Sequence, residues 1–159
     1  MSAGYAYLPE VATADVAFRA WGDGLGELFA AAARAMVAVM VEPVESLVAS
    51  SQHQVSLEGI SLDLLLHDFL QEILYAKDAL HLLLVPVSVT LTPAAGGPFV
   101  RPPAAAPPHH GYCLRGTLAG EAPDPARHQL GPEVKAVTLH RLAVVRTTAG
   151  WQAEVVLDI

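Results

Sequence analysis

Carboxylate groups stand at two places in the sequence where the neighbouring residues are apolar. Asp15 precedes an apolar strand-like segment, and Asp158 lies between Leu157 and Ile159, whose terminal carboxylate is one residue away. A charge beside an apolar strand is costly to bury without a partner. If the strands that carry Asp15 and Asp158 are neighbours, these side chains and the terminal carboxylate of Ile159 form a dense anionic cluster. Hard oxygen ligands of this kind suit Ca²⁺ or Mg²⁺ better than zinc.

The same carboxylates also have a simpler interpretation. Asp15 could mark the end of a strand, with Asp158 and the terminal carboxylate in water, because acidic side chains are mostly exposed on proteins. Spacing in the sequence therefore leaves two hypotheses open, a metal site and a set of solvated carboxylates.

Basic and imidazole side chains supply weaker candidates. Lys135 and His140 are five residues apart in the alternating segment 134–146, so an ideal strand would point them to opposite faces. One of them could contact a partner or a nucleotide. Arg127 and His128, in the sequence Asp-Pro-Ala-Arg-His, could bind an anion, but a solvated loop is the simpler expectation.

Several kinds of site are missing from the sequence. It has no glycine-rich phosphate loop, no nucleophile elbow and no His/Cys cluster with zinc spacing. Its one cysteine, Cys113, excludes a disulfide framework and is expected to be buried in a strand. Because no general base and nucleophile are grouped together, we expect a protein that is not an enzyme.

Charge and hydropathy restrict the partners further. Nine Lys and Arg against sixteen Asp and Glu give a net charge of −7, which argues against strong direct binding of nucleic acid. The first residues lack the basic and apolar regions of a signal peptide, and no run of 18 apolar residues could span a membrane. The sequence therefore predicts a cytoplasmic protein that acts through a protein partner or a metal ion.

Hydrophobic periodicity gives the elements that must position these residues. Apolar positions three and four apart predict amphipathic helices at 25–41, with Asp23 as its cap, and at 62–77, with Ser61 as its cap. The predicted strands are 15–21, 50–58, 82–92, 112–120, 134–146 and 151–159. Pro86 predicts an edge strand or a bulge.

This order of elements favours a single α+β domain over residues 1–159. We expect a mixed or antiparallel sheet of about five or six strands, with both amphipathic helices packed on one face. Residues 93–110 contain six prolines and no periodic pattern, which predicts a flexible loop within the domain. His109 and His110 at its end lack a third ligand for zinc.

Five motifs resemble those of the archease family, in the same order and over nearly the whole chain. They are TADV at 13–16 followed by FRAWG, LLLHDFLQEILY at 64–75, DPARH at 124–128, EVKAVTLH at 133–140 and GWQAEVVLDI at 150–159. The combination of the fourth motif with the last is the most specific. The chain departs from the family at Ala12, where a histidine is usual, at Ala17, where a glycine is usual, and in its longer proline-rich loop.

The resemblance implies an α+β fold and a divalent cation, calcium first, with Mg²⁺ or Mn²⁺ as alternatives. The implied ligands are Asp15, Asp158 and Ile159. The implied role is that of a non-enzymatic activator of an RtcB-type RNA ligase in tRNA splicing or RNA repair. It would promote guanylylation of the ligase histidine, with GTP bound by the ligase, and support multiple turnover. The alternative is a chaperone-like modulator of a tRNA methyltransferase.

Overall fold

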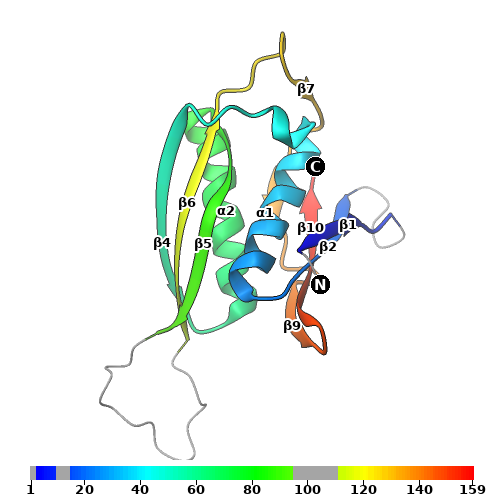
Figure 1. Cartoon of the computed structure of the whole chain (residues 1–159). Coiled ribbons are helices and arrows are strands. Elements are labelled where there is room, and N and C mark those ends of the chain that lie inside the picture. Colours follow the sequence, from blue (N-terminus) through cyan, green and yellow to red (C-terminus); the bar gives the residue numbers. More distant parts are fainter. Residues whose placement is uncertain (1–2, 10–14, 95–110) are drawn as a thin grey trace, which may run out of the picture.

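The computed structural model describes residues 3–9, 15–94 and 111–159. The predicted α+β class is confirmed: two helices combine with antiparallel sheets, one of which has five strands (Figure 1). The elements are β1 (Gly4–Tyr7), β2 (Val16–Gly22), α1 (Leu25–Met40), β3 (Val41–Glu42), the 3-10 helix η1 (Val44–Ser46), β4 (Ser51–Gly59), α2 (Leu62–Leu80), β5 (Leu83–Pro93), β6 (Tyr112–Glu121), β7 (Gln129–Leu130), β8 (Ala136–Val137), β9 (Ala143–Thr147) and β10 (Gly150–Asp158).

The strands are divided over separate sheets. The three-stranded sheet has the order β4-β6-β5, so β5 is an edge strand. Its register shifts between Pro86 and Ser88, which is the irregularity that Pro86 predicted. The five-stranded sheet has the order β1-β2-β10-β8, and β9 also pairs with β10. The strand β1 was not predicted, and β3 and β7 form a further two-stranded sheet.

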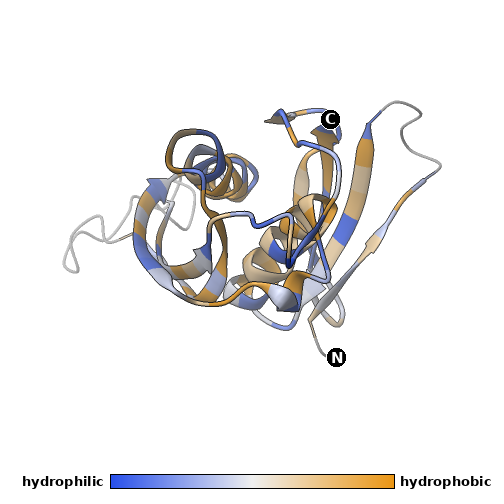
Figure 2. Cartoon of the chain, turned by 90° about the horizontal axis from the view of Figure 1, so that it is seen from above, coloured by the Kyte–Doolittle hydropathy of each residue, from blue (hydrophilic) through white to orange (hydrophobic). Residues whose placement is uncertain are grey.

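Both helices lie between the three-stranded sheet and the five-stranded sheet when the molecule is seen from above (Figure 2). Phe29 of α1 and Phe69 of α2 are fully buried, and their ring centroids are 6.1 Å apart. The helix α1 buries nine of its residues, four of them alanines, and such a nearly all-apolar helix suits a position between two sheets. The helices thus cover one face of the three-stranded sheet, and α1 is also covered by the second sheet.

The helix caps follow the prediction in one case and depart from it in the other. The Ser61 hydroxyl accepts a hydrogen bond from Leu64 N, as expected of a cap. Gly24, not Asp23, is the N-cap of α1, and no side chain caps that terminus. Instead, the Asp23 N–H donates to Glu27 Oε2 in the first turn (3.3 Å). Within the described residues, neither helix has the length and hydropathy of a membrane span.

The predicted strand 134–146 is wrong as a continuous element. It is split into β8 and β9, which pair with different parts of β10. Between them Leu142 N–H donates to Leu139 O (3.2 Å), and Arg141 has a left-handed φ of 59°. A tight turn therefore interrupts the apolar alternation, because left-handed backbone cannot continue a strand.

Candidate functional site

Asp15 and Asp158 lie at neighbouring strand ends. The strands β2 and β10 are antiparallel, and Leu157 is paired with Val16 at the end of their ladder. Asp15 precedes Val16 and Asp158 follows Leu157, so the two aspartates are the residues next to the last pair of this ladder. Both aspartates are exposed, and we call this pair the acidic tip.

The acidic tip has the oxygen chemistry that a hard cation needs, but two side chains do not complete a coordination shell. Within the described residues, no group of three or more His, Cys, Asp and Glu side chains is arranged to hold a metal ion. A cation bound between Asp15 and Asp158 therefore needs further oxygen donors, such as the terminal carboxylate or water. Ile159 packs against the hydrophobic core, which keeps the chain end next to Asp158.

Residues 134–144 begin beside the acidic tip, where Ala136 pairs with Asp158, and are fastened to α2 by three of its polar side chains. Lys77 Nζ donates to Val134 O (2.6 Å), and the Lys77 side chain is only 11% exposed. His67 Nε2 lies 2.9 Å from Val137 O, and since a carbonyl only accepts, this nitrogen carries the proton. Asp63 Oδ1 accepts from Val144 N (2.7 Å). We call Asp63, His67 and Lys77 the α2 clamp.

The fastened segment in turn holds the end of β10. Lys135 N–H donates to Asp158 O (2.7 Å), and Ala136 is paired with Asp158. The backbone N–H and the hydroxyl of Thr138 both donate to Val156 O, at 3.0 and 2.9 Å. The clamp therefore connects α2 to the segment that pairs with the end of β10.

Lys135 and His140 do not share a strand, so their predicted placement on opposite faces is wrong. Lys135 precedes β8, and His140 lies in the turn after it. Both side chains are exposed. The His140 N–H donates to Thr138 Oγ1 (3.3 Å), a contact within the turn. The backbone N–H of Lys135 is bonded to Asp158 O, so Lys135 lies next to the acidic tip. Its side chain is not used in this bond and is exposed.

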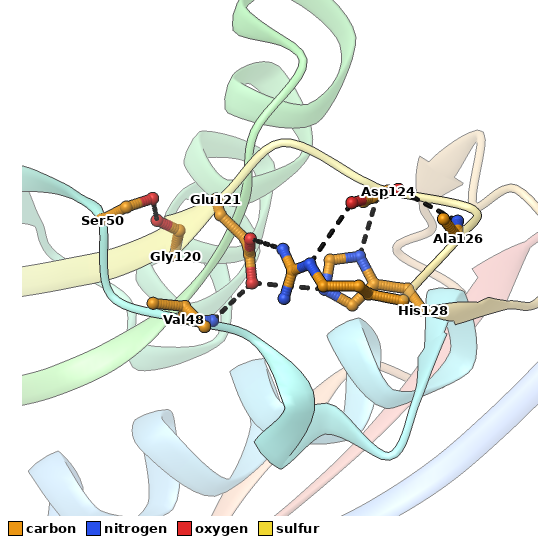
Figure 3. Close-up of polar contacts among 8 residues, drawn as sticks. Val48, Ser50, Gly120, Glu121, Asp124, Ala126 and His128 are labelled. Atoms are coloured by element: carbon orange, nitrogen blue, oxygen red, sulfur yellow. Dashed lines mark hydrogen bonds and ion pairs between the residues drawn. The ribbon is translucent and has the colours of Figure 1, made fainter.

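The DPARH segment is mostly solvated, as expected, since Pro125, Ala126 and Arg127 are exposed, but His128 is buried in a polar cluster with Glu121 (Figure 3). Glu121 Oε2 accepts from Val48 N (2.6 Å) and lies 3.2 Å from His128 Nε2, while Glu121 Oε1 accepts from Arg127. The Asp124 N–H donates to His128 Nδ1 (2.9 Å), so the proton of the buried imidazole is on Nε2. The cluster joins the segment after η1 to the segment after β6, which is a structural role.

The sequence contains part of the signal for this cluster. Asp124 Oδ1 accepts from Ala126 N (2.9 Å), and Asp124 Oδ2 accepts from Arg127 Nε (3.3 Å), a local turn that an Asp-Pro pair favours. The acceptor for His128 is Glu121, seven residues earlier, and Val48 comes from a distant part of the chain. Neither of those contacts follows from a repeating pattern in the sequence, so the sequence alone does not predict them.

We expect the stability of the protein to fall in acid partly through Glu121. The Val48 N–H and the Arg127 guanidinium hold the pKa of the Glu121 carboxyl below its usual range. Its contribution is therefore present above the unfolded pKa of about 4.3 and is lost as pH falls towards the folded value. Urea unfolding of Glu121→Gln should show lower stability than wild type at pH 7 and a smaller difference at pH 3. An equal difference at both pH values would contradict this role.

Cys113 is a strand residue, as predicted, but it is only half buried. Its Sγ lies 3.7 Å from Glu58 Oε1 on the neighbouring strand β4. Burial and the nearby Glu58 carboxylate raise the pKa of the thiol. The thiolate is therefore disfavoured, and Cys113 is not set up as a nucleophile.

The fold and the site define a single-domain α+β protein with an exposed acidic tip at two adjacent strand ends. The chain belongs to the Archease protein family (MTH1598/TM1083), whose model matches residues 5–159.

Curated relatives and a solved structure agree with this membership. The chain is 34% identical to protein archease of Pyrococcus furiosus over 148 residues, which are 92% of this chain and 94% of that protein. It is 32% identical to protein archease of Methanopyrus kandleri over 147 residues, again 92% and 94% of the two chains. The solution structure of Methanobacterium thermoautotrophicum protein 1598 superposes with a TM-score of 0.74 at 28% identity, covering 98% of this chain and 99% of that one.

Ala12 and residues 95–110, including His109 and His110, lie outside the described residues. Ala17, the other departure from the family pattern, is a buried core residue of β2.

Proposed function

We propose that this protein is a non-enzymatic activator of an RtcB-type RNA ligase and that its acidic tip binds a divalent cation, calcium first. The observation that supports the proposal is that the β2–β10 ladder ends at Val16 and Leu157, whose chain neighbours Asp15 and Asp158 are both exposed. Membership of the archease family supports the choice of partner and reaction, which are those that the motif resemblance implies.

The proposed action of the tip is electrostatic. A divalent cation offsets the negative charge of GTP phosphates and of the transition state as the guanylyl group passes to the ligase histidine. Asp15 and Asp158 hold that charge at an exposed end of the molecule, where a protein partner can reach it. Without a cation, the same carboxylates would repel the phosphates.

The neighbours of the tip have supporting roles in the proposal. The Lys135 ammonium is exposed next to Asp158 and is a candidate contact for the ligase or for a nucleotide phosphate. His140, exposed in the turn beyond β8, is a second candidate contact. The α2 clamp keeps this region in place, so the partner meets a preformed surface.

The proposal is tested with the full-length ligase of the same genome and GTP. Guanylylation of the ligase is measured with and without this protein, together with the number of RNA molecules joined per ligase. We expect faster guanylylation and repeated turnover in its presence. A protein that instead suppresses aggregation of a tRNA methyltransferase, unaffected by chelator, and leaves guanylylation unchanged would contradict the proposal.

Extending the chain past Ile159 tests the third proposed ligand. Two added glycines move the terminal carboxylate by up to about 7 Å. We expect this variant to bind Ca²⁺ more weakly in calorimetry, while the melting temperature stays close to that of wild type. A chain amidated at Ile159 is the matched control, because it removes the charge without adding length. Unchanged affinity in both variants would exclude Ile159 as a ligand.

A further inference from the structure

A pocket of about 720 Å³ lies directly beside the acidic tip, and the proposed metal site does not use it. Asp15 is part of its lining, together with β1, the start of β2, the end of α1 and η1. Tyr5, Tyr7, Val39 and Val44 give it a mainly apolar surface. Its volume is in the range of pockets that bind small molecules or the anchor side chains of a partner.

The charged groups among the described residues of the pocket all have one sign. Asp15, Glu42 and Glu45 line it, and no described Lys, Arg or His does. None of the three carboxylates forms an ion pair with another described residue. The C-terminal end of α1 also faces this region, with no basic residue in its last turn. A helix C-terminus carries a partial negative charge. The carboxylates and the end of α1 therefore both give the pocket a negative potential.

Tyr7 contributes a protonated hydroxyl to the pocket. Its hydroxyl donates to Ala35 O (2.8 Å). Burial first, then the neighbouring Tyr5 and Glu42, raise the pKa of Tyr7 to about 12. Tyr7 therefore stays protonated, and the pocket offers carboxylates and aromatic rings as its recognition groups. Aromatic faces and carboxylates both favour a cationic guest.

We propose that this pocket binds a segment of the partner ligase in which an arginine or lysine adjoins an apolar side chain. The proposal rests on the ligase-activator function, because that function supplies the protein partner. The apolar side chain fills the space between Tyr5, Val39 and Val44, and the cation meets Glu42 and Glu45. Nucleotides and RNA do not suit the pocket, since their phosphates would face three carboxylates. Because Asp15 belongs to both sites, a ligase seated at the acidic tip also covers the pocket.

Charge reversal at the rim tests this occupant. The variants are Glu45→Lys and, independently, Glu42→Lys, and both residues are exposed. The matched control is Glu72→Lys, an exposed glutamate of α2 that does not line the pocket. The affinity of each full-length variant for the full-length ligase is measured by calorimetry at low and high salt, and melting temperatures verify folding.

We expect each pocket variant to bind the ligase about tenfold more weakly than wild type at low salt, with a smaller salt dependence, because it replaces an attraction by a repulsion. The control should stay within about twofold of wild type, since rim charges outside an interface contribute little.

Three other outcomes would overturn the proposal in distinguishable ways. Wild-type affinity in both pocket variants, with Asp15→Asn still failing to stimulate the ligase, would remove the pocket and leave the activator function intact. Tighter binding by the lysine variants would mean that the pocket faces an anionic partner surface. A wild-type protein that neither binds nor stimulates the ligase would remove the activator function and this occupant together.

Discussion

The Asp158→Asn variant is expected to fold normally, to bind Ca²⁺ more than roughly 100-fold more weakly than wild type and to lose its stimulation of ligase guanylylation. Substitution of groups that merely support metal ligands costs about 10–100-fold in affinity, so loss of a charged ligand should cost more. Asp158 is exposed and pairs through its backbone with Ala136, and asparagine leaves that pairing in place. Asp15→Asn should behave in the same way, because Asp15 is the other proposed ligand and lies next to the end of the same ladder.

The control for this pair is Glu72→Gln. Glu72 is an exposed glutamate on α2, and its substitution changes the net charge by the same amount. Calorimetry with Ca²⁺, thermal unfolding and the guanylylation assay are run on all four proteins. Full stimulation by Asp15→Asn or Asp158→Asn would show that the carboxylates of the acidic tip do not act through a cation.

The Lys77→Met variant is expected to lose about 1–3 kcal/mol of stability, the cost of leaving a buried polar group without its hydrogen bond. Val134 is fully buried, and its carbonyl accepts from Lys77 Nζ at 2.6 Å. Methionine has a similar length but donates no hydrogen bond. The same substitution frees the segment that holds Asp158, through Lys135 N–H to Asp158 O. We therefore also expect calcium affinity at the acidic tip to fall by about tenfold, the loss typical of groups that orient metal ligands.

Urea unfolding and calcium calorimetry separate the two effects of Lys77. The Lys77→Arg variant should restore a large part of both, because a guanidinium can still donate to the Val134 carbonyl. If Lys77→Met lowers stability but binds calcium as wild type does, the α2 clamp supports the fold without positioning the tip.

The sequence predicts the helices and the long strands because each has a local pattern. The stripes of apolar residues in α1 and α2, the weak alternation in β4 and the apolar run 155–157 in β10 each arise within one element. The strand β1 has only four residues, Gly4–Tyr7, and β3 and β7 have two each, which is too short for a period to appear. The division of the strands into separate sheets is also a tertiary property, since it depends on which strands the helices separate.

The candidate site shows the same division between local and long-range information. Asp15 and Asp158 are conspicuous in the sequence because they are charges beside apolar strands. The α2 clamp is not conspicuous, because Asp63 and His67 have the spacing of an ordinary solvated helix face and meet their acceptors and donors about 70 to 80 residues away. In the sequence His128 looks like a loop histidine. In the structure it is buried and hydrogen-bonded to Glu121 and Asp124.

The measurement that tests the central claim most directly is the rate of ligase guanylylation at a fixed concentration of this protein while free Ca²⁺ is varied with a calcium buffer. The account predicts stimulation that rises with free calcium along the binding curve of the acidic tip and that shifts to higher calcium, or disappears, in Asp158→Asn. Stimulation that stays constant from chelator to saturating calcium, with wild type and Asp158→Asn alike, would contradict it.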